Sequence, residues 1–467
     1  MTQWIFCLLC ITTVAQSQTT KQVLTGTWTV SDNEEREFTV DTPYGLDSYS
    51  ALKIGGFLDD PLLDTHDTDY RWVANKNWTF THVFRVNPDS RRGLVNELVW
   101  NELDTFCRVS INDILLDQVN NSFLYRSWHL GNYIRIGGVN ILKLECTSTT
   151  QVVNQIAKSM KSPPPPDCWP SGFHGECHVN LVRSTQASFG WDWGPAFPIQ
   201  GFWQPPQLIR SELGCRFGTG FRFFASISNG NNGSVRDFVI APQTILWNAA
   251  VSVEVVFVPP MSDRLRSFCI SYIVDDLIPK GGMQCFTRYR IMNKLDVPVN
   301  LLIRQSGVTP WWPNGIVTGP HTYRLQLKLI TTKGTVLDQT EHTIGFRLFD
   351  VIEQPVKPEQ LSLGLSFYFR VNGLPVFAKG ANWIPSRLLP GRSSGHMRLV
   401  NDTLPLGFGS ARQLLASAAV AGVNVIRIWG GGRYEPDSFY DEADRLGLMI
   451  WHDMMFAVST YAKQDPG

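Results

Sequence analysis

The sequence carries no net charge, because 41 Lys and Arg residues balance 41 Asp and Glu residues over 467 positions. Proteins that bind nucleic acids or anionic membranes through their overall charge need a clear excess of Lys and Arg. We therefore expect neither a nucleic acid nor a membrane as a partner. The composition, with 12% aromatic residues, suits an uncharged substrate.

The motifs of several common enzyme chemistries are also absent. The sequence contains no GxSxG nucleophile motif, no HExxH zinc motif, no phosphate-binding loop and no dinucleotide-binding GxGxxG. The three glycines Gly430–Gly432 are not a phosphate loop, because no Lys followed by Ser or Thr comes after them. We expect no cofactor and no metal ion.

Long apolar runs are missing beyond the N-terminus. Ile5–Val14 is apolar but too short to span a bilayer, and Ala15-Gln16-Ser17 supplies the small residues typical of a cleavage site. We interpret residues 1–17 as a secretory signal peptide, with a buried strand as the alternative. Four N-glycosylation sequons fit a secretory route, at Asn77, Asn120, Asn232 and Asn401.

Cysteines are few, and an odd number follows the signal segment. Two of the nine cysteines lie in that segment, so seven remain and at least one has no partner among them. Cys168, His174, Cys177 and His178 lie close together, which leaves a metal site as an alternative. Their spacing matches no standard zinc pattern, and an oxidising compartment disfavours free thiolates. A Cys168–Cys177 disulfide is the preferred interpretation.

The chain is too long for a single core, and its pattern divides into three parts after the signal. Residues 18–212 show short β segments separated by turn residues, with one helical segment at Thr150–Met160, which predicts a β jelly-roll sandwich. Residues 213–350 repeat a β pattern typical of an immunoglobulin-like sandwich. Residues 351–467 alternate strands and helices, which predicts the start of a (β/α)8 TIM barrel.

The barrel-like part is predicted element by element. We expect a helix over Ala411–Ala421, a strand over Asn424–Trp429, a helix over Asp437–Leu446 and a strand over Leu448–Trp451. Asp437 is the expected N-cap of the second helix, and the glycine after each helix is its expected stop. Residues 386–410 form a Gly/Ser-rich segment that is long for a loop in a compact unit.

The most informative stretch is Ala187–Trp203, ASFGWDWGPAFPIQGFW. Its glycines and prolines interrupt any period-two alternation, so we expect a rigid loop and no central strand. This loop presents Trp191 and Trp193 on either side of Asp192. Sugar pockets combine flat aromatic faces with carboxylates that accept hydroxyl hydrogen bonds. The alternative is a buried Trp corner in which Asp192 caps local backbone N–H groups.

Two strings carry a resemblance to a known family. WDWGP, followed by GFW and preceded by ECHVN (Glu176–Asn180), resembles β-mannosidases, and so does NVIRIWGGGRYEPDSFYDEADRLGLMIWHD at residues 424–453. These enzymes belong to the glycoside hydrolase family that also holds β-galactosidase and β-glucuronidase. The resemblance implies the Cys168–Cys177 disulfide and a lysosomal or secreted location. The sequence is similar to the N-terminal half of such an enzyme.

The resemblance implies retaining hydrolysis of terminal non-reducing β-D-mannose from β-mannosides and N-glycan-derived oligosaccharides. This reaction uses two Glu residues, one of them in an Asn-Glu pair after the fourth barrel strand. The Asn-Glu pairs of this sequence, Asn33-Glu34, Asn96-Glu97 and Asn101-Glu102, all lie in the first β part, and we expect them at the surface. We expect both catalytic Glu residues beyond Gly467 and the 467-residue chain to be inactive by itself.

The residues that carry over belong to the substrate pocket. The resemblance assigns substrate contacts to Trp191, Asp192, Trp193, Trp429 and Arg427. A structural ion pair is the alternative for Arg427, and we expect core packing for Trp451 and helix-surface positions for Asp437 and Glu442. The alternative functions are a non-catalytic carbohydrate-binding or unstable product and a β-galactosidase-like or β-glucuronidase-like specificity. The sequence gives no indication of the oligomeric state.

Overall fold

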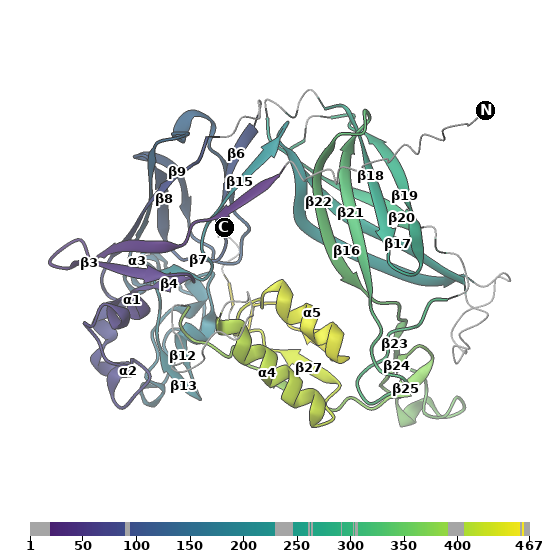
Figure 1. Ribbon diagram of the computed structural model, residues 1–467. Coiled ribbons are helices and arrows are strands. Elements are labelled where there is room, and N and C mark those ends of the chain that lie inside the picture. Colours follow the sequence, from purple (N-terminus) through teal and green to yellow (C-terminus); the bar gives the residue numbers. More distant parts are fainter. Residues whose placement is uncertain are drawn as a thin grey trace, which may run out of the picture.

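The chain folds into two β-sandwiches with a smaller α/β unit between their lower ends (Figure 1). The computed structural model describes residues 19–88, 94–228, 246–259, 262, 265–290, 292–301, 303, 307–390, 406–457 and 460–461. The expected signal peptide at residues 1–17 and the sequons at Asn232 and Asn401 lie outside these residues. Asn77 and Asn120 are both exposed.

The first sandwich packs a six-stranded sheet, in the order β3-β2-β5-β11-β8-β9, against smaller sheets ordered β1-β15-β6-β10 and β4-β14-β7. Its strands are β1 (Thr20–Val23), β2 (Gly26–Ser31), β3 (Glu37–Thr42), β4 (Leu46–Asp47), β5 (Trp78–Arg85), β6 (Leu94–Val99), β7 (Leu103–Asp104), β8 (Cys107–Ile111), β9 (Ile114–Val119), β10 (Ser127–His129), β11 (Val139–Cys146), β14 (Gly201–Phe202) and β15 (Gln207–Glu212). Its helices are α1 (Ser48–Ile54), α2 (His66–Asp69) and α3 (Thr149–Ser159).

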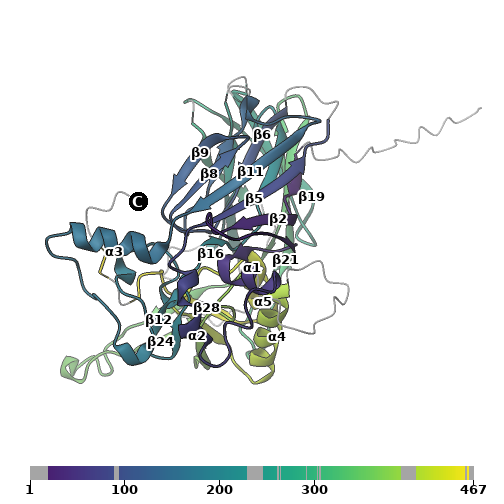
Figure 2. The ribbon, with the colours of Figure 1, turned by 90° about the vertical axis from the view of Figure 1, so that its left-hand side faces the viewer.

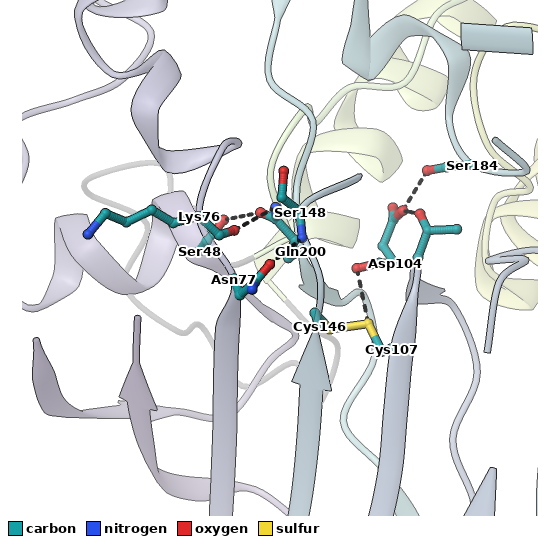
Figure 3. Close-up of a disulfide and its surroundings, with 10 residues drawn as sticks. Ser48, Lys76, Asn77, Asp104, Cys107, Cys146, Ser148, Ser184 and Gln200 are labelled. Atoms are coloured by element: carbon teal, nitrogen blue, oxygen red, sulfur yellow. Dashed lines mark hydrogen bonds between the residues drawn. A yellow bond between two sulfur atoms is a disulfide. The ribbon is translucent and has the colours of Figure 1, made fainter. Parts of the chain in front are cut away.

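The core of this sandwich is aromatic, with Trp28, Trp78, Trp100 and Phe202 fully buried. The disulfide Cys107–Cys146 joins the neighbouring strands β8 and β11 at directly opposite positions (Figure 3). Just beyond β11, Ser148 caps α3 by accepting the backbone N–H of Gln151. The strands and the helix that the sequence predicts in this part are therefore confirmed.

The second sandwich contains two antiparallel sheets, ordered β16-β17-β20 and β19-β18-β21-β22. Its strands are β16 (Cys215–Ser228), β17 (Leu246–Phe257), β18 (Ser267–Val274), β19 (Ile278–Thr287), β20 (Lys294–Leu301), β21 (Tyr323–Thr331) and β22 (Val336–Ile344). Alternation along β21, with Tyr323, Leu325, Leu327 and Leu329 buried, builds the core that the sequence predicts.

The α/β unit follows a three-stranded antiparallel sheet of β23 (Phe349–Ile352), β24 (Tyr368–Val371) and β25 (Leu374–Val376). The unit itself is a parallel sheet, β26-β27-β28, of Gly380–Trp383, Val425–Ile428 and Met449–His452. Helix α4 (Leu406–Val420) lies between the first two strands in the sequence and α5 (Asp437–Leu446) between the last two. This alternation confirms the strand and helix pattern predicted after residue 380.

Several local features differ from what the sequence predicts. Helix α1 was not predicted. It is seven residues long, and Asp47 caps it by accepting the N–H groups of Tyr49 and Ser50. Pro436, not Asp437, is the N-cap of α5, because Asp437 already has helical geometry. Glu442 is buried and paired with Arg445, whereas Trp451 is 51% exposed, because the sheet face that it lies on has little packed against it.

A buried ion pair joins the two sandwiches. Arg216 of β16 donates to both carboxylate oxygens of Glu97 on β6, with Nε–Oε2 at 2.7 Å and Nη2–Oε1 at 3.1 Å. Both side chains are only 3% exposed. The expectation that Glu97 lies at the surface is therefore wrong. The reason is nonlocal, because its partner lies 119 residues away in the sequence.

A second joint connects the second sandwich to the α/β unit. The Trp311 indole N–H donates to the carbonyl of Asp444 on α5 at 2.8 Å. The Asn314 amide donates to the carbonyls of Ala419 and Val423, at 2.7 and 2.9 Å, near the end of α4. The segment around Trp311 is thus a Trp-anchored turn that fastens the second sandwich to both helices of the α/β unit.

Six of the seven cysteines that follow the expected signal segment form three disulfides, Cys107–Cys146, Cys168–Cys177 and Cys269–Cys285. Among the described residues Cys215 is the unpaired one, and burial raises the pKa of its thiol. The odd cysteine expected from the sequence is therefore identified. None of the helices in the described part of the chain is long and apolar enough to cross a membrane.

Asp32, in the turn between β2 and β3, generates a pH-dependent prediction. Burial acts to raise the pKa of its carboxyl, but N–H donors from Glu34, Glu35 and Arg36, with Lys76 and the Arg36 guanidinium, lower it below its ordinary value of 3.8. A lowered pKa stabilises the fold above the unfolded pKa, and this stabilisation is lost as the pH falls toward the folded one.

We expect Asp32→Asn to lower the free energy of unfolding by about 1–3 kcal/mol at pH 7 and by clearly less near pH 2, which lies well below the unfolded pKa and approaches the folded one. Denaturant unfolding at both pH values measures this difference. Asp41→Asn, at an exposed position on β3, is the control. An equal loss at both pH values would show that the carboxylate charge of Asp32 does not stabilise this turn.

Candidate functional site

The WDWG segment forms a tight β-hairpin. Strands β12 (Phe189–Trp191) and β13 (Gly194–Ala196) pair antiparallel, with Asp192 and Trp193 in the turn. The stretch has no central strand, as expected, but the expected loop is partly a hairpin of two short strands. Glycine and proline are tolerated because the hairpin has two edge strands, and Gly190 adopts φ 97°, which favours glycine.

The Cys168–Cys177 loop supports this hairpin from one side. The N–H of Glu176 donates to the carbonyl of Phe189 at 2.7 Å, and the N–H of Ala196 donates to the carbonyl of His174 at 3.1 Å. The Cys168–Cys177 disulfide closes this loop, as the preferred interpretation of the sequence predicts. It also rules out the metal alternative in this structure, since both thiols are bonded to each other.

Arg71 ties this loop to the first sandwich. Its guanidinium donates to the carbonyl of Gly175 at 3.2 Å and lies 3.7 Å from the Glu176 carboxylate. Burial raises the pKa of Glu176, and the charge of Arg71 opposes that shift. On the exposed side, His174 Nδ1 lies 2.7 Å from an Asp67 oxygen. The base of the hairpin is thus held by backbone and charged contacts together.

Four indoles gather where the hairpin meets the α/β unit. The Trp191 and Trp429 ring centroids lie 4.6 Å apart at an interplanar angle of 81°, and those of Trp193 and Trp429 lie 5.5 Å apart at 67°. Trp169, from the disulfide loop, contacts Trp191 at 5.0 Å. Three sequence-predicted residues, Trp191, Trp193 and Trp429, therefore share one surface although up to 238 positions separate them in the sequence.

Exposure within this cluster leaves its outer side open. Trp193 is 50% exposed, and Asp192 beside it is also exposed. No hydrogen bond or ion pair of the Asp192 carboxylate is found within the described residues. The alternative of a buried Trp corner capped by Asp192 is therefore not what the structure contains. The turn presents a carboxylate next to flat aromatic faces, a combination suited to a sugar ring.

Arg427, two residues before Trp429, lies at the end of β27. Its guanidinium donates to Asp453 (Nε–Oδ1 3.3 Å), which follows β28, and to Asn382 Oδ1 on β26 at 3.0 Å. Asp453 also accepts the N–H of Gly430 at 3.3 Å. The ion pair considered as the alternative for Arg427 is thus present. The Arg427 side chain is 39% exposed, so it can also contact a ligand.

Apart from Asp192, the charged groups named here are engaged in holding the described site together. Asp453 is paired with Arg427, and Glu435 accepts the indole N–H of Trp383 at 3.0 Å. Among the described residues, no three His, Cys, Asp or Glu side chains are placed to hold a metal ion. The arrangement is suited to binding a neutral ring.

Sequence reasoning missed the groups that join the first sandwich to the Trp429 loop. Arg433 donates to Glu102 Oε2 at 3.1 Å, and its guanidinium carbon lies 4.0 Å from the Trp203 ring centroid. The expectation that Glu102 is a surface residue is therefore wrong. Burial raises the pKa of Glu102, and Arg433 opposes that shift. The sequence offered one signal for this contact, the Trp at the end of the GFW string. That signal indicated Trp203 but neither Glu102 nor Arg433.

Comparisons with known proteins show which family the sequence is similar to. Residues 28–204 match the glycosyl hydrolase 2 galactose-binding domain-like family. The chain is 31% identical to β-mannosidase of Mus musculus over 95% of its own length and 46% of that protein. It is 28% identical to a probable β-mannosidase of Caenorhabditis elegans over 94% of its own length and 45% of that protein.

A solved structure gives the same result. The crystal structure of a β-D-mannosidase from Dictyoglomus thermophilum superposes with a TM-score of 0.76 and 25% identity, covering 96% of this chain and 48% of the other. The chain thus spans about half the length of the relatives that it matches. The multidomain, β-rich fold and the resemblance inferred from the two strings are confirmed.

The packing of Gly190 generates a testable prediction. A Cβ atom at Gly190 would lie 2.6 Å from the Gly175 Cα, and the backbone there has a positive φ. We expect Gly190→Ala to separate the hairpin from the disulfide loop and to lower the free energy of unfolding by about 1–3 kcal/mol.

Gly194→Ala is the matched control, because a Cβ at that position meets nothing within 4 Å. Thermal unfolding and tryptophan emission measure both variants. Equal behaviour of the two alanine variants would contradict the role assigned to the Gly190–Gly175 contact.

Proposed function

Because the chain matches the N-terminal half of β-mannosidases of glycoside hydrolase family 2, we propose that it supplies one side of a site for terminal β-D-mannose. The substrates are β-mannosides and N-glycan-derived oligosaccharides with β-mannose at the non-reducing end. The observation that carries the proposal is the contact of Trp191 and Trp193 with Trp429 across two separate parts of the fold.

Each residue of the cluster has a distinct task in this proposal. Trp429 and Trp193 offer ring faces to the C–H groups of the sugar. Asp192 is exposed, and its carboxylate accepts hydrogen bonds from sugar hydroxyls. Arg427, held by Asp453 and Asn382, donates to a sugar oxygen at the strand ends. Binding free energy thus comes from both the hairpin and the α/β unit.

The reaction assigned to the complete site is retaining hydrolysis, which needs two carboxyl groups about 5–5.5 Å apart. The Glu residues of the three Asn-Glu pairs are engaged elsewhere: Glu34 with Lys76, Glu97 with Arg216 and Glu102 with Arg433. We assign the catalytic pair to polypeptide that the 467 residues do not contain. The sheet β26-β27-β28, with α4 and α5, would form the first part of a (β/α)8 barrel around that pair.

The proposal also covers organisation and location. Residues 18–212 form the jelly-roll domain, 213–350 the immunoglobulin-like domain and 351–467 the barrel start. The three largest clusters of buried residues support these limits, with Leu389 as the one buried residue that packs on the first cluster from the third part. Two smaller clusters lie across the limits: Trp311 and Trp312 pack with Val371, Val376 and Met449, and Val95 packs with Val256 and Val258. Three disulfides fit the secretory pathway, with a lysosomal or secreted destination.

A non-catalytic carbohydrate-binding protein is the second candidate function. The observation that favours it is an exposed sugar-type surface without a free carboxyl pair beside it among the described residues. The mass of the native, deglycosylated protein separates the two candidates. A mass near the 52.7 kDa of this chain favours the binding protein, and a much larger one favours a β-mannosidase.

Sugar binding tests the proposed pocket. We expect methyl β-D-mannoside to bind more tightly than the methyl β-D-galactoside or β-D-glucuronide, as measured by saturation-transfer NMR and calorimetry. Asp192→Ala should weaken mannoside binding about tenfold or more, since hydrogen bonds to a charged group contribute about 1.5–3 kcal/mol. Asp59→Ala, exposed elsewhere on the first sandwich, is the control. A preference for galactoside or glucuronide would contradict the proposed specificity.

Activity of the 467-residue polypeptide tests the assignment of the catalytic pair. We expect no detectable release of 4-nitrophenol from its β-D-mannoside above the rate in buffer, because the proposal assigns neither the acid nor the nucleophile to these residues. Turnover by pure polypeptide that Asp192→Ala abolishes would contradict this assignment.

A further inference from the structure

The segment that carries Trp429 is attached to the first sandwich at two points. Its Gly431 carbonyl accepts the N–H of Ala187, which lies two residues before β12, at 3.0 Å. The Trp429 ring packs closely over Gly431, where a Cβ atom would lie 2.2 Å from the indole. The first attachment therefore holds the backbone directly beneath the ring.

The second attachment is Arg433. Its guanidinium donates to Glu102 on one side and makes a cation–π contact with Trp203 on the other, with the guanidinium carbon 4.0 Å from the ring centroid. The Arg433 and Glu102 side chains are 16% and 23% exposed, so solvent screens this pair only partly. Trp203 is itself fixed, because its backbone N–H donates to the Glu102 carbonyl at 3.1 Å.

The receiving side of this contact is rigid. Glu102 has a positive φ of 56°, a conformation that the surrounding structure must impose on a residue other than glycine. The Trp203 indole N–H donates at 3.3 Å to the carboxylate of Asp104, which is fully buried and also accepts from Ser184 (Figure 3). Arg433 therefore meets a surface that is already organised within the first sandwich.

We propose that Glu102, Trp203 and Arg433 are positioning residues, which hold the Trp429 indole against Trp191 and so complete the sugar-binding surface. The two attachments lie on either side of Gly432, which leaves the loop little freedom. A cavity of about 340 Å³ borders Glu102, Trp203 and Arg433, so a released Arg433 side chain has room to move away. The sugar-affinity part of this inference rests on the proposed function, whereas the loop geometry does not.

The experiment compares Arg433→Met and Glu102→Gln in the 467-residue protein. Hydrogen exchange of the peptide spanning 428–434 and acrylamide quenching of Trp429 emission report on the loop, with Trp429→Phe used to identify that emission. We expect exchange about tenfold faster in both variants and methyl β-D-mannoside binding about tenfold weaker. Arg433→Lys, which keeps the charge but loses the planar stacking, should rescue part of both losses.

Arg445→Met is the matched control. It removes the same charge from the same α/β unit, at an exposed residue of α5 that pairs with Glu442. If Arg433 has a merely structural role, Arg433→Met should lower the melting temperature, and hydrogen exchange of the peptide 428–434 should be the same as in Arg445→Met. That result, in both Arg433→Met and the isosteric Glu102→Gln, would overturn the inference. Glu102→Gln alone decides if Arg433→Met does not fold.

The two proposals fail in distinguishable ways. If the wild-type protein binds no β-mannoside but the loop loosens in both variants, the proposed function is wrong and the positioning role stands. If the wild-type protein binds the mannoside and both variants bind it equally well with an unchanged loop, the positioning role is wrong and the proposed function stands. A double variant whose loop exchange is no faster than that of either single variant would support a direct Glu102–Arg433 coupling.

Discussion

The buried, bidentate pair between Glu97 and Arg216 joins the two sandwiches, and the rest of the arrangement depends on that joint. The α/β unit touches both sandwiches: Trp311 and Asn314 hold it on one side, and Arg433 holds it on the other. The three parts therefore form a closed ring of contacts, visible as a triangle in Figure 1. Removing one partner of a buried ion pair leaves an uncompensated charge, so this joint tolerates little change.

The candidate site lies on the joint that closes this ring. The hairpin belongs to the first sandwich and lies at the same lower end of the molecule as the α/β unit (Figure 2). The indoles of the cluster come from both parts, so neither part alone presents the complete surface. A small shift at either of the other two joints would therefore displace Trp429 relative to Trp191. Such a site is only as precise as the domain packing around it.

Periodic segments could be predicted from the sequence, and contacts between distant segments could not. The alternation in β21 and the Gly447 that ends α5 are local signals, and both are found where the sequence indicates them. Glu97 and Glu102 look like surface residues because the arginines that bind them lie 119 and 331 positions away. The Trp cluster was recovered through family strings, since nothing local brings Trp191 to Trp429. Trp169 was missed for the same reason.

The disulfides of the described chain all close over short distances, with separations of 39, 9 and 16 residues. Two of them connect adjacent strands and the third closes a single loop, so each covalent cross-link stays within one sandwich. The ring is therefore covalently reinforced inside its first two parts, while its three joints consist of reversible contacts. Under oxidising conditions each sandwich can mature by itself, and the joints can still separate and re-form without any thiol chemistry.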